Sequence, residues 1–270
     1  MILLAAGVAR ADGNDVQLFK LGPPDDGGQA RFHRYVSTLG LAFAPPFQDP
    51  AGTLGLHGFE IGLSSTEALL RADSAASWAG ESAAQPQALT LPAVVLRKGL
   101  GGSIEIGAAA SWLSQSQVFA ASGELRWAFF DGLHYLPDFA LRLWGTHLFG
   151  DRELDLSMLG ADLQLAKSFG VLGNFELTPY VHGGVQMIDA QTGLVDFGAA
   201  GARQAFHRVA FWENRYYRGA AGLRAVIGVL LLGVEGTFAR GDNPIQHSGS
   251  AIPQETVQLW TVSARLGLHF

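Results

Sequence analysis

Twelve charged residues of this sequence have the types and spacing to form ion pairs or to line a pore. When each apolar stretch is read as a strand whose side chains alternate between two faces, these residues fall opposite the large apolar side chains. The acids are Glu60, Glu105, Glu124, Asp162, Glu176 and Glu235, and the bases are Arg97, Arg126, Arg142, Arg218, Arg224 and Arg265. All six bases are arginine, whose planar guanidinium group pairs with carboxylates through two parallel hydrogen bonds.

Two kinds of interior fit this set of charges. In the first, arginines and carboxylates pair with each other and close the interior, since buried charges need partners and the two signs occur in equal numbers. In the second, rings of charge line a polar pore and set its selectivity. The equal numbers favour the paired interior, and the sequence leaves both open.

Catalysis is a third possibility, and the sequence gives it little support. His182 falls on the same strand face as Tyr180 and Glu176, an arrangement that also suits plain hydrogen bonding. No serine lies in a nucleophile motif, no His-Glu-x-x-His pattern occurs, and the absence of cysteine excludes thiolate chemistry. We therefore predict a protein that is not an enzyme and has no catalytic residue, metal or cofactor. The net charge of −6 argues against a nucleic-acid partner.

The elements that carry these charges are short strands separated by turn residues. Each strand has about the length that a tilted strand needs to cross a bilayer. They are expected near 57–66, 88–98, 103–114, 118–130, 138–149, 153–167, 174–188, 214–227, 229–240 and 256–270. The longest apolar run, 225–234, is too short for a transmembrane helix, so a chain that spans a membrane this way must close into a barrel. The sequence predicts an all-β, antiparallel transmembrane barrel over 57–270 with about ten strands, or twelve if 33–44 is also a strand.

The last strand alternates strictly and ends on an aromatic residue. Its apolar positions include Trp260, Val262, Leu266, Leu268 and Phe270. This pattern resembles the C-terminal assembly signal of bacterial outer-membrane β-barrels. The resemblance implies a Gram-negative outer-membrane location, recognition of this strand by the barrel-assembly machinery, and contact with outer-membrane lipid and lipopolysaccharide.

The N-terminal part is expected to stay outside the barrel wall. Residues 1–11 have the short apolar stretch and small-x-small site of a signal-peptide remnant. Residues 12–56 are interpreted as a periplasmic linker that contains a plug helix near 32–43. Residues 39–51, which include Asp49-Pro50-Ala51, resemble the Gly/Ala-rich N-terminal plug of the long-chain fatty-acid and hydrocarbon channels, and this resemblance implies partial occlusion of a pore.

Loop lengths predict the orientation of the barrel. The connections 67–87, 189–213 and 241–255 are long and alternate with tight turns such as 99–102 and 228, as expected for outer loops and periplasmic turns. The leading functional prediction is a porin-like barrel for passive passage of small or apolar solutes. The alternative is a non-conducting structural or surface-interaction barrel, and a lipid-active enzyme comes third. The sequence identifies no solute and no oligomeric state.

Overall fold

The computed structural model describes most of the chain. The described residues are 14–46, 48, 50–80, 86–132, 136–171, 173–198, 203–243, 246–247, 250–251 and 255–270. The predicted signal-peptide remnant, residues 1–11, and Asp49 of the plug-like motif lie outside these ranges.

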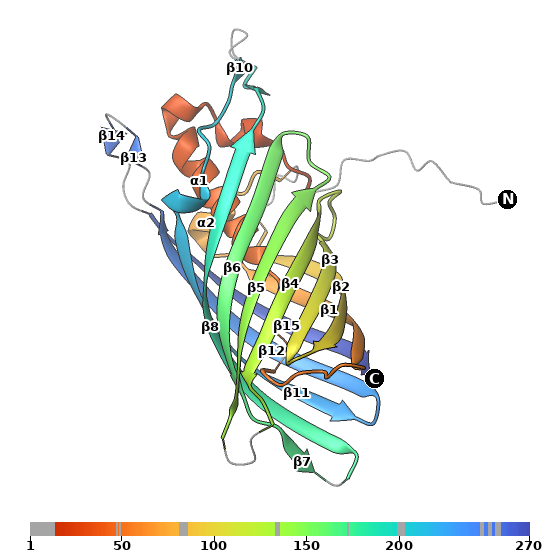
Figure 1. Ribbon diagram of the computed structural model, residues 1–270. Helices are drawn as coiled ribbons and strands as arrows, with labels where there is room; N and C mark the ends of the chain where they lie inside the picture. Colours follow the sequence, from red (N-terminus) through yellow and green to blue (C-terminus); the bar gives the residue numbers. More distant parts are fainter. Residues whose placement is uncertain are drawn as a thin grey trace, which may run out of the picture.

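Ten long antiparallel strands close into a barrel (Figure 1). They are β1 (Phe59–Leu69), β2 (Ala88–Gly101), β3 (Ile104–Trp112), β4 (Phe119–Phe130), β5 (Asp138–Phe149), β6 (Leu154–Ala166), β8 (Phe175–Thr192), β11 (Arg215–Ile227), β12 (Leu230–Asn243) and β15 (Glu255–His269). Neighbours in this series pair with each other, and β15 pairs with β1 to close the ring. The predicted ten-stranded barrel is confirmed, and no described strand covers 33–44.

Short elements complete the described chain. Short strands are β7 (Phe169–Val171), β9 (Val195–Asp196), β10 (Arg203–Gln204), β13 (Gln246–His247) and β14 (Ser250–Ala251). Helical elements are η1 (Leu18–Leu21), η2 (Pro24–Asp26), α1 (Gly28–Ala42), α2 (Ala72–Ala76) and η3 (Phe211–Glu213). In the described part of the chain, no helix is long and apolar enough to span a bilayer.

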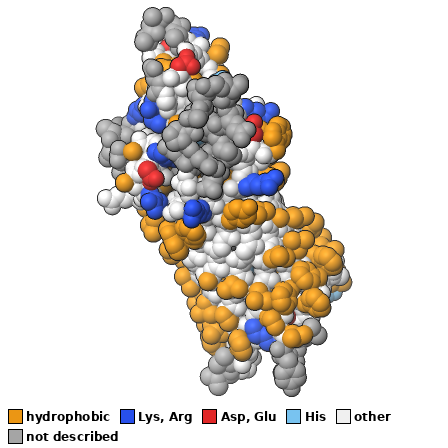
Figure 2. All heavy atoms as spheres, turned by 90° about the vertical axis from the view of Figure 1, so that its left-hand side faces the viewer, with side chains coloured by type: hydrophobic (Ala, Val, Ile, Leu, Met, Phe, Trp, Pro, Cys, Tyr) orange, Lys and Arg blue, Asp and Glu red, His pale blue; other side chains and the backbone are white. Residues whose placement is uncertain are grey.

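The outer face of the barrel is apolar because the large side chains of each strand point outward. Leu63, Leu163 and Val234 stand 61, 60 and 50% exposed at outward positions of three different strands. In Figure 2 such side chains are spread over the visible face of the barrel wall, with backbone showing between them. A closed barrel satisfies every strand's backbone groups internally, so this apolar band can face lipid without unpaired polar backbone.

The two ends of the barrel differ. At one end the connections are tight, as at Gly228, whose φ of +61° suits glycine, and backbone hydrogen bonds join Phe59 to Phe270. At the other end lie the connections after β1, β8 and β12, which are long, and those after β3 and β5, which are short. This arrangement agrees with the loop pattern expected from the sequence.

Helix α1 occupies the interior of the long-loop end (Figure 1). Its buried residues pack among inward side chains such as Leu89, Met158 and Ile188 in one apolar core. Gln186 donates to the Gly40 carbonyl at 2.8 Å, and a Cβ at Gly40 would lie 2.6 Å from Ile188 Cδ1, so a larger residue there would force the Ile188 side chain to shift.

This placement corrects the prediction that residues 12–56 lie with the periplasmic C-terminus. The described part of that segment begins at the opposite end of the barrel from Phe270 and reaches β1 only by passing through the lumen. The physical reason is that α1 is buried almost all round, and the inner wall at this end offers an apolar enclosure for it. The helix also begins earlier than the predicted residue 32.

Candidate functional site: the ion-paired lumen

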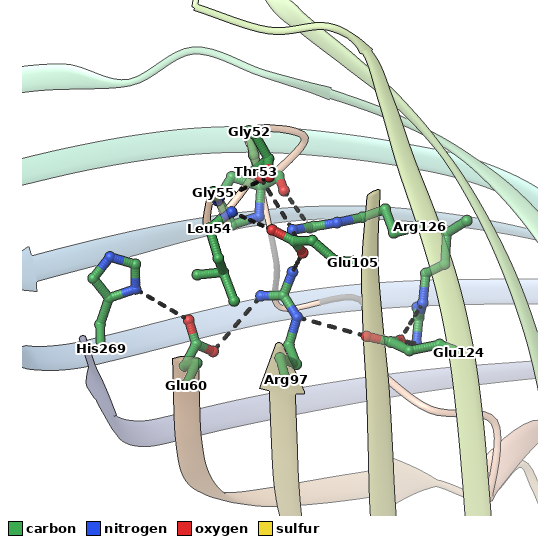
Figure 3. A network of polar contacts seen from close by, with 12 residues as sticks. Gly52, Thr53, Leu54, Gly55, Glu60, Arg97, Glu105, Glu124, Arg126 and His269 are labelled. Atoms are coloured by element: carbon green, nitrogen blue, oxygen red, sulfur yellow. Dashed lines mark hydrogen bonds and ion pairs between the residues drawn. The ribbon is translucent and has the colours of Figure 1, made fainter. Parts of the chain in front are cut away.

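Glu60 is the centre of the cluster nearest the tight-turn end. Its carboxylate is fully buried and lies 2.5 Å from Arg265, 2.9 Å from Arg224 and 3.7 Å from Arg97. The His269 Nδ1 lies 3.6 Å from the same carboxylate (Figure 3). Three arginines from three strands therefore converge on one acid of β1.

The network continues around the wall with alternating sign. Arg97 also pairs with Glu105, which pairs in turn with Arg126, and Arg97 Nε lies 3.6 Å from Glu124. Figure 3 shows these side chains pointing toward one another from adjacent strands. A direct path of charge-to-charge contacts thus runs from β1 to β4.

Strands β5 and β6 extend this path. Arg142 Nη2 lies 2.6 Å from Glu124, and its Nη1 lies 3.7 Å from Asp162. Trp144 donates its indole N–H to Asp162 at 2.7 Å, and the Arg218 guanidinium lies 5.4 Å from the centre of the Trp144 ring. The aromatic ring therefore links the carboxylate of β6 to an arginine of β11.

The charges of the wall also bind the chain segment that runs through the lumen. Arg126 donates to the carbonyls of Pro50 at 2.5 Å and Gly52 at 3.0 Å, and Glu105 accepts from the Leu54 N–H. These contacts fix residues 50–54 against β3 and β4 (Figure 3).

A second set of contacts holds the preceding residues on the other side of the barrel. Glu235 accepts from the Gln48 N–H at 2.6 Å, and Arg218 donates to the Pro45 carbonyl at 3.3 Å. In the described part of this segment, residues 43–46, 48 and 50–58, few backbone groups pair with other backbone, so charged side chains of the wall supply hydrogen bonds that buried backbone requires.

A small cavity remains between this segment and the wall. It measures about 40 Å³ and is bordered by residues 42–46 and Gln48 on one side and by β1 to β5 and β15 on the other. The wall is built there from small inward residues such as Ala109, Ser111 and Ser122. Such a volume holds a few water molecules.

The structure places the predicted lumen residues on the inner face. Ten of the twelve charged residues are buried: Glu60, Arg97, Glu105, Arg126, Arg142, Asp162, Arg218, Arg224, Glu235 and Arg265. Glu124 is slightly more accessible, with 14% of its side chain exposed. Glu176 lies half-buried at the tight-turn rim, where its described hydrogen bonds come from the hydroxyls of Ser168 and Thr178.

His182 is buried on the inner face, with its ring centroid 4.9 Å from that of Tyr180. Among the described residues, no group of three or more His, Cys, Asp or Glu side chains is arranged to hold a metal ion. The residues of the predicted assembly signal, Trp260, Val262, Leu266, Leu268 and Phe270, are all exposed.

Sequence reasoning predicted a plug but missed the wall contacts that hold the lumen segment and the role of Trp144. The alternation of β5 places Trp144 on the inner face two residues after Arg142, so the pattern contained a signal for it. The contacts of Pro45, Gln48, Pro50 and Gly52 are made by backbone atoms, so their residue types carry no signal.

No family model matches the sequence, and no curated protein matches it. Among solved structures, the chain is similar to the N-terminal β-barrel domain of OprF from Pseudomonas aeruginosa, at 13% identity over 80% of this chain and 99% of that chain, with a TM-score of 0.31. It is also similar to Ail, the attachment invasion locus protein of Yersinia pestis, solved with the heparin analogue sucrose octasulfate. The identity is 9% over 79% of this chain and 99% of that chain, with a TM-score of 0.32. The translocator domain of the autotransporter NalP from Neisseria meningitidis matches at 10% identity over 92% of this chain and 98% of that chain, with a TM-score of 0.30.

The features of the molecule itself define its class. A closed barrel with an even number of antiparallel strands, an apolar outer band, tight turns at one end and long loops at the other is the architecture of bacterial outer-membrane β-barrels. The protein is an outer-membrane barrel of this architecture, as the sequence predicted.

Proposed function

We propose that this protein is a sealed outer-membrane barrel that holds its own N-terminal segment in the lumen and presents α1 and the long loops as an outer contact surface. The observation that carries the proposal is the anchoring of Pro45, Gln48, Pro50, Gly52 and Leu54 by charged side chains of β3, β4, β11 and β12. This is the alternative that the sequence left open beside passive passage.

The paired charges support a closed lumen. A pore that selects by charge needs side chains whose charge faces the permeating solute. Here Glu60, Glu105 and Glu124 face arginines or backbone N–H groups, and the cavity beside the lumen segment measures about 40 Å³, a volume suited to water. Passage of small solutes is therefore expected to require that Pro45, Gln48 and residues 50–54 leave the lumen.

The position of α1 supports an outer contact surface. Residues 14–42 lie at the long-loop end, which faces the outside of the cell under the loop-length rule for these barrels. Gln29 of α1 exchanges hydrogen bonds with the backbone of His207 in the loop after β8, so the helix and this loop form one surface. Trp212 and Leu194, which are 74 and 71% exposed, stand at the same end.

Single-channel recording in a planar bilayer tests the proposal. The full chain is expected to be silent, and a variant that lacks residues 14–56 is expected to give stepwise conductance, because the wall charges then line an open lumen. Circular dichroism and resistance to SDS at room temperature establish that both proteins are folded barrels. Steps from the full chain would contradict the sealed lumen and support porin-like passage.

We further propose that β15 is the strand recognised by the barrel-assembly machinery, supported by the exposed outward row from Trp260 to Phe270. The predictions that the protein is not an enzyme and binds no cofactor stay predictions.

A further inference from the structure

A groove lies on the outer face of the barrel between β11 and β12, toward the long-loop end. It measures about 390 Å³ and is lined by Tyr217, Arg218, Gly219, Phe238, Arg240 and Gly241. This volume is in the range of sites that take small molecules. The groove faces outward, so it is separate from the ion-paired lumen.

The shape of the groove follows from one missing side chain. Gly219 lies directly opposite Phe238, and Tyr217 lies directly opposite Arg240. A Cβ at Gly219 would meet only the His182 carbonyl oxygen within 4 Å, at 3.9 Å, so the space above this glycine is open. Phe238 is fixed on its other side by Trp260, with ring centroids 4.7 Å apart. The trough thus has a glycine floor, with Tyr217 and Phe238 beside it.

Arginines gather at the long-loop end of this groove. Arg240 and Arg215 are both exposed on outward positions of neighbouring strands. Arg240 lies opposite Gln258, whose side-chain oxygen accepts from Arg71 at 3.2 Å, so a third arginine stands close by. Figure 2 shows basic side chains along the border of the apolar band on this face.

Arg215 lies opposite Asp242 in the register of β11 and β12, so Arg240 and Arg71 are the arginines that supply positive charge at the border of the groove. Asp73 lies 3.7 Å from Arg71, with both side chains about half exposed, so solvent weakens this pair. Glu67 points outward from β1 and accepts from Thr90 of β2, on the side of β1 away from the groove. The border of the groove therefore keeps an excess of positive charge among the side chains described.

We infer that this groove binds an acylated, phosphorylated lipid of the outer leaflet. An acyl chain lies over Gly219 between Tyr217 and Phe238, and a headgroup phosphate meets Arg240 and Arg71. The order of groups along the barrel axis matches such a lipid: apolar side chains in the band, aromatic rings at its border and guanidinium groups above them. Guanidinium is the cation best suited to phosphate, since it can donate two parallel hydrogen bonds to one phosphate group.

The occupant is a membrane lipid because the groove lies within the lipid-facing wall. A soluble phosphate would use the arginines but leave the trough below them empty. A lipid fills both parts at once, since its chains are already in the apolar band. Outer-leaflet lipid A, which carries acyl chains and phosphates on a sugar, supplies this chemistry as a probe.

Native mass spectrometry of the refolded full chain in detergent measures the binding. The chain is titrated with bisphosphorylated lipid A and, in parallel, with the same lipid after removal of its phosphates. We expect the phosphorylated lipid to bind about tenfold more tightly, because charged hydrogen bonds are lost with the phosphates. Equal binding of the two lipids would overturn the inference.

Two variants separate the parts of the site. The double variant Arg71→Gln/Arg240→Gln is expected to remove the preference for phosphate, and Gly219→Leu, which fills the trough, is expected to weaken both lipids about tenfold. The matched controls are Arg152→Gln in the loop after β5 and Gly123→Leu on the outer face of β4, where a Cβ meets nothing within 4 Å.

Equal losses in the controls would refute the assignment, as would displacement of the lipid by millimolar inorganic phosphate, which would point to a free anion instead. Resistance to SDS reports whether each variant is folded. The result does not depend on the state of the lumen, so it stands apart from the conductance test.

Discussion

Glu60 is the residue whose loss is expected to damage the lumen most. Its carboxylate is fully buried and forms ion pairs with Arg265, Arg224 and Arg97 at 2.5, 2.9 and 3.7 Å. In Glu60→Gln the shape is kept, but the three guanidinium groups lose the negative charge between them. Removing one partner of a buried ion pair costs about 3–5 kcal/mol, because the remaining charge is left uncompensated.

We expect a value near the lower end of that range. Arg97 keeps Glu105 and Glu124 as partners, so its charge stays compensated. Arg224 and Arg265 lose the carboxylate that lies 2.9 and 2.5 Å from them, and water can enter the nearby lumen only as far as the small cavity allows. A loss of ~3 kcal/mol with a urea slope of ~3 kcal/mol per M lowers the unfolding midpoint by about 1 M.

Urea unfolding in lipid vesicles, followed by the fluorescence of the six tryptophans, measures this shift. The matched control is Asp73→Asn, which removes a half-exposed partner of Arg71 and is expected to cost about 0–1 kcal/mol. An equal midpoint shift in both variants would refute the ion-paired lumen.

A double-mutant cycle sharpens the test. Arg224→Gln alone leaves Glu60 with two arginines, so it is expected to cost less than Glu60→Gln. If the two residues interact as the distances indicate, the double variant is hardly less stable than Glu60→Gln alone. Strictly additive losses would mean that the 2.9 Å contact contributes nothing to stability.

Three further predictions follow from other contacts. Arg126→Gln removes the donor to the Pro50 and Gly52 carbonyls, so we expect the lumen segment to loosen and brief conductance steps to appear. The control Lys98→Gln alters a donor to the Leu56 and Gly58 carbonyls near the rim and is expected to show no conductance steps. In the loop after β5, burial and then the Glu153 carboxylate raise the pKa of Asp151 to about 6, against backbone N–H groups that lower it. The folded chain then holds a proton that the unfolded chain releases between about pH 4 and 6, so stability falls as the pH rises through that window. Asp151→Asn is expected to add about 1–2 kcal/mol at pH 7, after allowance for partial exposure, and nothing below pH 4; urea midpoints that change equally at both pH values would contradict this. The chain has no cysteine, so a single introduced cysteine can be labelled alone. Phe19→Cys, at an exposed site, is expected to react with a membrane-impermeant maleimide on intact cells, whereas Asn174→Cys at the tight-turn end is not. The opposite pattern would place α1 on the periplasmic side of the membrane.

The residue pattern by itself determined which side chains of the barrel wall face lipid and which face the lumen. Strands must alternate between two environments, so the spacing of Leu125, Arg126 and Trp127 already assigned each side chain to lipid or lumen. A charge in lipid at mid-depth costs about 2–4 kcal/mol, which fixes the face of each arginine and carboxylate without knowledge of its partner. The strand count and the tight turns followed from the same local rules.

Only the tertiary structure decided what fills the lumen. Partners such as Glu60 and Arg224 are far apart in sequence, and barrel closure brings them together across β1, β15, β12 and β11. The path of residues 43–58 depends on backbone hydrogen bonds to wall charges, and backbone groups are alike at every position. The sequence therefore predicted a plug helix but put it at the wrong end, because α1 lies where the closed wall forms an apolar enclosure, which no single strand reveals.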